Sequence, residues 1–357
     1  MALDGIVISS LVKEFNETLT GGKIAKIAQP ENDELLLTIK NFRNQYRLLI
    51  SAGASLPLIY LTGDNKPSPM TAPNFCMLLR KHIANGKILR IWQPGLERII
   101  HFEIEHLNDL GDLCHKVLTV EIMGKHSNII FCDDNNKIID SIKHVGIQMS
   151  SVREVLPGRE YFIPHTQDKE NPLTITEERF RETVLTKPLP LSKALYMTLT
   201  GISPLIAEEI CHRASLESDQ SANSFSDTEA THLYHTFSRL MEDVKNGNFT
   251  PTVVYDGREP LEFSALPLTL YQDKRVETFE SISAVLENYY AMKNTITRIR
   301  QRSSDLRRIV NTALERNRKK NELQLSQLKD TEKRGKLRGS GAHHKTNSST
   351  LEHSVQK

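Results

Sequence analysis

The sequence Glu121-Ile122-Met123-Gly124-Lys125-His126-Ser127-Asn128 follows directly on a run with the pattern of a β-strand. Apolar residues alternate with polar ones over residues 117–122, and again over residues 99–105, which is the spacing of strands with one buried face. Gly95-Leu96-Glu97-Arg98 immediately precedes the earlier run. A rigid sheet can hold polar side chains at its strand ends toward a ligand. We therefore expect Glu97, Arg98 and residues 121–128 to form one surface.

The residue types in this surface indicate the kind of ligand. Lys125 is a cation, His126 is an aromatic that can stack or donate, and Ser127 and Asn128 are short hydrogen-bonding groups. The set contains neither the usual zinc ligands nor a nucleophile with its base, so we predict no catalytic residue and no metal site. It suits a phosphate backbone with 2′-hydroxyl groups, which favours RNA.

Composition limits the class of protein. A chain of 357 residues with 38% hydrophobic and 25% charged residues predicts two or three globular units. Its four cysteines are widely spaced and form no CxxC pair, which argues against a zinc finger or a disulfide framework. The start of the chain lacks the pattern of a signal peptide, and no apolar run has membrane-spanning length. We expect a cytoplasmic protein that does not contact a membrane.

The first 172 residues predict an α+β unit. A helix over residues 4–19 has Asp4 as its N-cap, and a second helix covers residues 74–85. Closely spaced strand patterns separated by turn residues favour hairpins over crossovers. These strands are expected at 23–28, 34–40, 46–51, 88–92, 99–105, 117–122, 128–132 and 137–141. The fold class is therefore a mainly antiparallel β-sandwich with packed helices.

The rest of the chain predicts three further parts. Residues 173–280 form a helical domain with a small β-addition, in which Gly201-Ile202-Ser203-Pro204 links two helices as a helix-hairpin-helix. Such a turn offers backbone N–H groups to phosphate, so Gly201 and Ser203 are candidate contacts. Residues 281–334 have the apolar spacing of a coiled-coil arm. The polar residues 335–357 are expected to be disordered.

The coiled-coil arm is also basic. Between residues 293 and 338 there are fifteen Lys or Arg and five Asp or Glu, a ratio suited to nucleic acid. The densest cluster supplies further candidate contacts to a nucleic-acid backbone, namely Arg316, Arg318, Lys319 and Lys320.

Several of these segments together resemble the NFACT family. The resemblance rests on the start Ala2-Leu3-Asp4-Gly5, the 121–128 motif, the 201–204 turn and the run 314–320, and it covers about residues 1–334. It implies an N-terminal domain shaped like that of formamidopyrimidine-type DNA glycosylases, then the helix-hairpin-helix domain and the coiled coil. It also implies tRNA contacts by Glu97, Arg98, Glu121, Ile122, Met123, Lys125, His126, Ser127 and Asn128.

The resemblance further implies a function without intrinsic enzyme chemistry and without a cofactor. Family members bind the large ribosomal subunit obstructed by a peptidyl-tRNA, and they recruit tRNA, which is alanyl-tRNA in bacteria. They promote template-free C-terminal tailing of the stalled chain, while the ribosome forms the peptide bonds. Two features depart from the family pattern. Glu97 replaces an Asp, and the return arm of the coiled coil and the NFACT-R domain do not follow.

Other interpretations of the same residues stay open. Glu97 and Arg98 can be a solvated surface pair, and residues 124–128 a polar turn. A DNA glycosylase-like enzyme would need an N-terminal proline nucleophile and a zinc finger, whereas this chain has Ala2-Leu3-Asp4 and scattered cysteines. A surface adhesin that binds fibronectin, a further role attached to the family, would need an export signal or an anchor.

Overall fold

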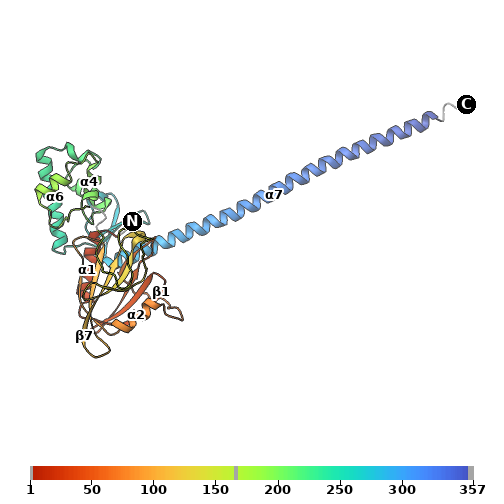
Figure 1. Cartoon of the computed structure of the whole chain (residues 1–357). Helices are drawn as coiled ribbons and strands as arrows, with labels where there is room; N and C mark the ends of the chain where they lie inside the picture. The colour runs from red at the N-terminus through yellow and green to blue at the C-terminus, as the bar shows by residue number, and fades with distance from the viewer. Residues whose placement is uncertain (1–2, 165–167, 353–357) are drawn as a thin grey trace. The chain divides into compact units, whose positions relative to one another are not determined.

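The computed structural model describes residues 3–164 and 168–352, although the side chains of 294–305, 337 and 339–352 are outside this description. The chain divides into two compact units, Met1–Met292 and Lys293–Lys357. Figure 1 labels the main elements along the chain.

The first unit is built on one nine-stranded sheet with the order β4-β3-β2-β1-β5-β6-β7-β8-β9. Each pairing between neighbouring strands is antiparallel. The strands are β1 (Lys23–Glu31), β2 (Glu34–Asn41), β3 (Asn44–Ser51), β4 (Leu58–Leu61), β5 (Lys87–Trp92), β6 (Ile99–Leu107), β7 (Leu113–Glu121), β8 (Asn128–Asp133) and β9 (Ile138–Ser141). The predicted α+β class with an antiparallel sheet is confirmed.

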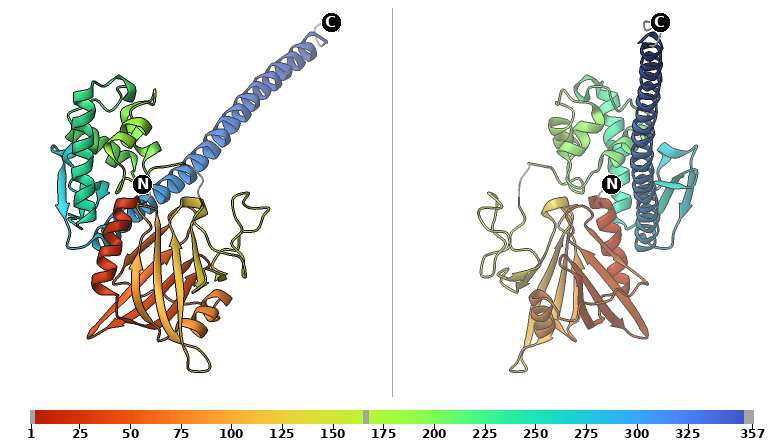
Figure 2. Two further views of the ribbon diagram at one scale, coloured as in Figure 1. Left: turned by 60° about the vertical axis from the view of Figure 1, so that its left-hand side comes forward. Right: turned by 90° about the vertical axis from the view of Figure 1, so that its right-hand side faces the viewer.

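Backbone hydrogen bonding joins the two halves of the predicted sandwich into one continuous sheet. β1 and β5 share one registered pair, Lys23 with Lys87, and this pair joins the two halves into a single sheet. Apolar side chains of both halves nevertheless belong to one core, and the Phe15 ring of the first helix lies 6.1 Å from that of Phe102 on β6. Figure 2 shows the strands curving around this shared interior. A strongly twisted sheet encloses its own core, so alternation in the sequence could not distinguish it from a sandwich.

Two helices pack on the sheet as the sequence predicted. α1 (Gly5–Thr18) is capped by Asp4, whose Oδ1 accepts hydrogen bonds from Ile6 N at 3.1 Å and Val7 N at 2.9 Å. This satisfies backbone donors that a helix start leaves free. α2 (Asn74–Ile83) follows Pro73 and buries Phe75, Cys76, Leu79 and Ile83.

A helical region with a small sheet follows, and Figure 1 shows α4 and α6 lying close together within it. Its elements are α3 (Glu177–Thr183), α4 (Leu191–Thr198), α5 (Pro204–Arg213), α6 (Asp227–Lys245), β10 (Thr252–Asp256), β11 (Glu259–Ser264) and β12 (Arg275–Thr278). The Glu209 carboxylate, fully buried on α5, accepts hydrogen bonds from Thr269 N at 2.9 Å and Leu270 N at 3.1 Å. It thereby ties α5 to the segment between β11 and β12. The helix-hairpin-helix assignment for α4 and α5 stays a prediction.

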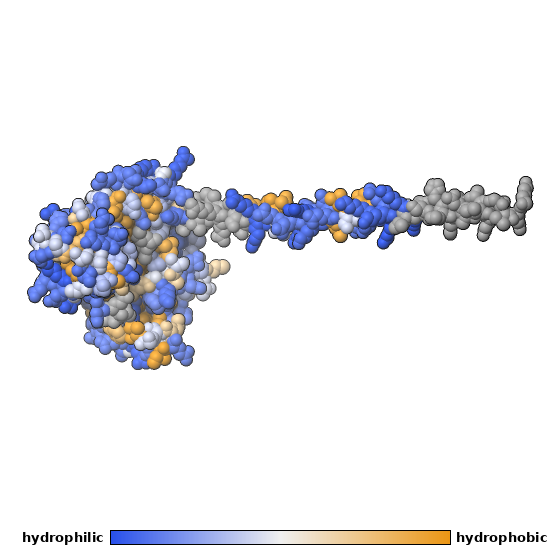
Figure 3. Space-filling model, turned by 90° about the horizontal axis from the view of Figure 1, so that it is seen from above, coloured by the Kyte–Doolittle hydropathy of each residue, from blue (hydrophilic) through white to orange (hydrophobic). Residues whose placement is uncertain are grey.

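The last helix, α7 (Ile282–Glu352), runs from the first unit into the second. In the second unit it carries exposed apolar side chains, including Leu306, Val310 and Leu314, at three- and four-residue spacing; some appear as orange atoms in Figure 3. This spacing fits the expected coiled-coil arm, which stays a prediction. Ile296 and Ile299 of the expected seam lie outside the described side chains.

The predicted disordered tail differs from the structure, because α7 stays helical through Glu352. Low hydrophobicity shows only that a segment cannot build a core, whereas a helix satisfies its backbone hydrogen bonds internally. Within the described residues, none of the helices is both long and apolar enough to cross a bilayer.

Candidate nucleic-acid interface

A pocket of about 460 Å³ opens at one end of the nine-stranded sheet. It is lined by Glu97, Arg98, Met123, Lys125, His126, Ser127, Asn128, Lys143, His144, Val145, Met149, Ser150, Val152, Arg153, Val155, Pro164, Lys169, Thr200 and Gly201. Arg98 and the 125–128 corner therefore border the same cavity. Their role as tRNA contacts stays a prediction.

Strand register explains why these segments meet. Ile99, the first residue of β6, pairs with Glu121 at the end of β7, and Glu121 pairs with Asn128 at the start of β8. The backbone N–H of Ile122 donates to the carbonyl oxygen of Arg98 at 2.8 Å. The start of β6, the end of β7 and the start of β8 are thus neighbours at one edge of the pocket.

A tight turn after β7 presents Lys125 and His126 to solvent. Gly124 has a φ of +59°, a left-handed conformation that other L-residues rarely adopt, and residues Gly124–His126 form a 3-10 turn. The turn is closed by Ser127, whose Oγ accepts a hydrogen bond from Met123 N at 2.8 Å. Lys125 and His126 are both exposed, so their side chains can reach a ligand.

Ser127 and Asn128 border the pocket, but their side chains are used by the protein itself. Both are almost fully buried. The Asn128 amide donates to Lys143 O at 2.9 Å and accepts from Ile129 N at 2.9 Å and Lys143 N at 3.1 Å. Direct contact with RNA stays a prediction for these two residues, and the contacts described here shape the corner and tie it to the segment after β9.

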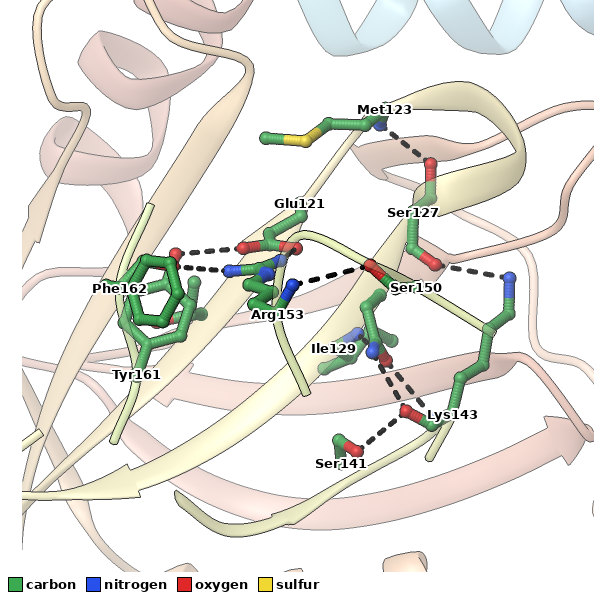
Figure 4. A network of polar contacts seen from close by, with 12 residues as sticks. Glu121, Met123, Ser127, Ile129, Ser141, Lys143, Ser150, Arg153, Tyr161 and Phe162 are labelled. Carbon is green, nitrogen blue, oxygen red and sulfur yellow. Dashed lines mark hydrogen bonds and ion pairs between the residues drawn. The ribbon is translucent and has the colours of Figure 1, made fainter. Parts of the chain in front are cut away.

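Glu121 and Ile122 lie in the interior, and their predicted contact with tRNA stays a prediction. Both side chains are 0% exposed, and Ile122 belongs to the apolar core. The Glu121 carboxylate pairs with Arg153 and accepts a hydrogen bond from the Tyr161 hydroxyl at 2.9 Å, as Figure 4 shows. A polar residue at the end of an alternating strand looked exposed in the sequence, because its partners follow only 32 and 40 residues later.

Arg153 joins this buried carboxylate to the wall of the pocket. Its guanidinium donates to Phe162 O at 2.5 Å, and its backbone N–H donates to Ser150 Oγ at 3.4 Å. Burial, reinforced by the charge of Glu121, raises the pKa of the Tyr161 hydroxyl, which therefore stays protonated and donates. The ion pair thus holds the segment that follows β9, up to residue 164, against the end of β7.

The lining of the pocket is positively charged, although the Arg153 charge is balanced by its ion pair with Glu121. This lining contains the five cations Arg98, Lys125, Lys143, Arg153 and Lys169, with Glu97 as the one carboxylate in that lining. Within the described part of the chain, neither the Arg98 guanidinium nor the Lys125 ammonium makes a hydrogen bond or an ion pair. Such side chains are available to an anionic ligand.

Lys143 and Lys169 are held in place by backbone oxygens. Lys143 Nζ donates to Ala52 O and, at 3.2 Å, to Ser127 O, and Lys169 Nζ donates to Tyr196 O at 3.0 Å. Burial, with the charge of Arg98, lowers the pKa of Lys169. Burial is the larger cause of this shift, and the charge of Glu97 opposes it.

The floor of the pocket joins the sheet to the helical region. Gly5 N donates to Gly201 O at 2.9 Å, and Ser203 Oγ donates to the second carboxylate oxygen of Asp4 at 2.7 Å. Burial raises the pKa of Asp4 despite these donors, while the nearby charge of Arg98 lowers it. Ser203 Oγ also accepts from Ile206 N at 3.3 Å, so this side chain caps α5, while the predicted phosphate contact through the backbone of the 201–204 turn stays a prediction.

The basic candidates on α7 lie in the second unit. Arg316, Arg318, Lys319 and Lys320 are all exposed, and Arg318 pairs with Glu322 at 3.4 Å.

Sequence reasoning missed several residues of the pocket: Lys143, Met149, Val152, Arg153 and Lys169. None of them belongs to a motif, although the four apolar residues among the polar ones in 143–153 were a usable signal.

Comparison with known proteins identifies the class. The sequence pattern of the family described as "NFACT N-terminal and middle domains" matches residues 4–353, and the chain belongs to this family. The match extends beyond the range of about 334 residues that the resemblance predicted.

Named relatives and solved structures narrow the comparison. The chain is 36% identical over 333 residues to the Rqc2 homolog RqcH of Bacillus subtilis (strain 168), covering 93% of this chain and 55% of that protein. It is 26% identical over 295 residues to the archaeal Rqc2 homolog aRqcH of Methanocaldococcus jannaschii, covering 81% of this chain and 42% of the relative. The N-terminal structure of the fibronectin/fibrinogen-binding protein from Streptococcus suis matches with a TM-score of 0.67 at 30% identity, covering 81% of this chain and 99% of the other. The chain spans about half the length of the bacterial relatives.

Proposed function

We propose that this chain is the RNA-binding part of a ribosome quality-control factor and that its pocket binds tRNA. The observation that carries the proposal is the convergence of the unengaged cations Arg98 and Lys125 with the exposed ring of His126 on one cavity. Cations position a phosphate backbone, while an aromatic ring and a guanidinium can stack on unpaired bases.

Within this proposal the pocket residues have separate roles. Arg98 contacts a phosphate or a base edge, and Glu97 orients it or accepts from a base amine. Lys125 neutralises phosphate, and His126 and Met123 contact a base or ribose. Glu121, Ser127 and Asn128 hold the pocket walls without touching the ligand, as their buried contacts support.

We infer the wider role from the family and from the Rqc2 homologs that the chain resembles. We infer that the whole protein binds the large ribosomal subunit obstructed by peptidyl-tRNA and recruits tRNA, alanyl-tRNA in bacteria, for template-free tailing. It acts in the cytoplasm and is not itself an enzyme, since positioning of tRNA leaves peptide-bond formation to the ribosome. The basic arm of α7 supplies further contacts to nucleic acid.

Titration of the chain with deacylated tRNA tests the pocket directly. Arg98→Ala is expected to weaken binding at least about tenfold, since a lost charge-assisted contact is worth about 1.5–3 kcal/mol. The matched control is Arg239→Ala, which removes an exposed arginine from α6 in the same unit. Equal tRNA affinity of wild type and Arg98→Ala would remove the pocket from the proposal.

A second candidate function is binding of fibronectin, because solved structures with high fold similarity carry that activity in their names. Surface plasmon resonance against immobilised fibronectin tests it. Binding that survives Arg98→Ala and exceeds the affinity for tRNA would favour this candidate.

A further inference from the structure

A second basic surface lies on the first unit, away from the pocket. Lys40 on β2, Lys23 on β1 and Lys87 on β5 occupy directly paired positions on three neighbouring strands. Paired positions share one face of a sheet and neighbouring strands are about 4.8 Å apart, so the three ammonium groups form a row. All three side chains are exposed, and none makes an ion pair within the described residues. We call this set the lysine row.

An exposed aromatic side chain adjoins the row. Phe42, in the turn between β2 and β3, is 100% exposed and has a φ of +52°. A shallow hollow of about 550 Å³ is lined by Lys23, Lys40 and Phe42, together with Gly21, Ala25, Asn41 and Asn85. The ring and two of the lysines therefore border one depression.

The stability of the fold does not explain these residues. Like charges on directly opposite positions repel one another and weaken a sheet. A left-handed φ is strained for a bulky residue, and a fully exposed ring gains nothing from burial. Next in register beyond Lys87 is Glu105, and among the described residues it makes no ion pair with a lysine of the row.

The lysine row and the pocket lie at opposite ends of the β5–β6 hairpin. Lys87 pairs with Glu105, which lies seven residues along the chain from Arg98. At about 3.3 Å per residue this places the row roughly 23 Å from Arg98. A phosphate bound in the pocket cannot also contact the row.

We propose that the lysine row and Phe42 form a second RNA-binding surface, which takes an unpaired segment of a structured RNA. Cations that follow a backbone, combined with an aromatic platform for one base, are the means by which proteins hold single strands. Paired RNA would leave Phe42 without an accessible base face, so the ring favours a single-stranded ligand. This surface is independent of the tRNA pocket.

Fluorescence anisotropy with a labelled single-stranded oligoadenylate of roughly 12 nucleotides tests the proposal, since site sizes of about 4–16 nucleotides are usual. The substitutions Lys23→Gln, Lys40→Gln and Lys87→Gln are combined in one full-length chain. The matched control combines Lys81→Gln, Lys137→Gln and Lys193→Gln, which remove the same charge from exposed positions elsewhere in the unit.

The row variant is expected to lose about tenfold or more in affinity, and the slope of log affinity against log salt should fall by about 2 units. The control should retain wild-type affinity. Melting temperature is the second readout, and it should stay unchanged or rise in the row variant because repulsion is relieved. Equal affinity of the row variant and the control overturns the proposal.

Phe42→Gly separates RNA from other acidic partners. This substitution relieves the left-handed strain, so the melting temperature should rise while oligoadenylate affinity falls several-fold. Photo-crosslinking of a thiouridine-containing oligonucleotide should label the peptide with Phe42 and Arg43. Crosslinks confined to the Arg98 pocket or α7, or equally tight binding of polyglutamate that is insensitive to Phe42→Gly, would overturn the assignment.

Discussion

The carboxylate of Glu121 and the guanidinium of Arg153 form an ion pair in the interior of the first unit, with side-chain exposures of 0% and 10%. The two residues belong to the end of β7 and to the segment after β9 that lines the pocket. The 121–128 motif thus begins with a buried residue, Glu121, that stabilises the pocket through Arg153.

Glu121→Gln should destabilise the fold by about 3–5 kcal/mol, because it leaves the Arg153 charge buried without its partner. Urea unfolding followed by fluorescence of Trp92, the one tryptophan in the chain, measures this. The control Glu103→Gln removes a carboxylate that is 27% exposed on the same sheet, and should cost under about 1 kcal/mol. Unchanged stability with lost tRNA binding would show instead that Glu121 contacts RNA.

Asn128→Ala should cost about 2 kcal/mol or more, because three backbone groups of Ile129 and Lys143 lose their partner. Its effect on tRNA affinity should follow the loss of folded structure. Thermal melts and tRNA titrations on the same samples check this relationship. Arg98→Ala should show the opposite pattern, with affinity lost and stability retained.

Binding of tRNA should weaken steeply with added salt if the pocket cations contact phosphates. Each phosphate contact contributes about 0.7–0.9 to the slope of log affinity against log salt, so Lys125→Ala should reduce the slope by about that amount. Filter binding between low and physiological ionic strength gives the slope. A flat response in the wild type would argue against phosphate contacts.

Acid should destabilise the first unit through His101. Burial, with the charge of Arg90, lowers the pKa of this imidazole to about 4. In the unfolded chain it titrates near 6.5, so the unfolded state binds the proton first as pH falls, and stability is lost between about pH 6.5 and 4.

The size of this effect is about 3 kcal/mol, from about 1.4 kcal/mol for each unit of pKa. Urea unfolding at intervals across this pH range measures it. His101→Gln removes the titrating group and should flatten the pH dependence. Thr119, whose Oγ1 lies 2.8 Å from His101 Nδ1, can still be hydrogen-bonded by Gln. An equal pH dependence in both chains would contradict the assignment.

Gly201→Ala should destabilise the junction between the sheet and the helical region. A Cβ atom there would lie 2.1 Å from Leu96 O, and the φ is +73°. Gly111→Ala is the matched control, since its φ is +87° but no heavy atom lies within 4 Å. The control carries only the conformational cost of about 1–2 kcal/mol, and the excess at Gly201 measures the close approach. Equal effects would show that the backbone can move apart.

The sequence predicted the parts of the fold that local pattern determines. Alternation located β6, β7 and β8, and Asp4 identified the start of α1, because these signals act over a few residues. It also located the segments that border the pocket, since register places strand ends together.

Contacts between residues that lie far apart in the chain could not be predicted from the sequence. Nothing near Glu121 shows that Arg153 and Tyr161 bury its charge, and nothing near Ser203 shows its bond to Asp4, 199 residues away. The same limit hid Lys143 and Lys169 as pocket residues. Disorder was expected after residue 334 because composition reports on the capacity to form a core, not on helix continuity.

The antiparallel β5–β6 hairpin gives the first unit a fixed internal length. One end of the hairpin adjoins Arg98 and the other end carries Lys87. Two RNA elements, one bound at each end, would therefore be kept at a set separation by the backbone hydrogen bonds of the hairpin. Inserting two residues in each strand would preserve which side chains face outward and widen that separation by about 7 Å. The length of the two strands alone would then set the distance between the two bound RNA elements.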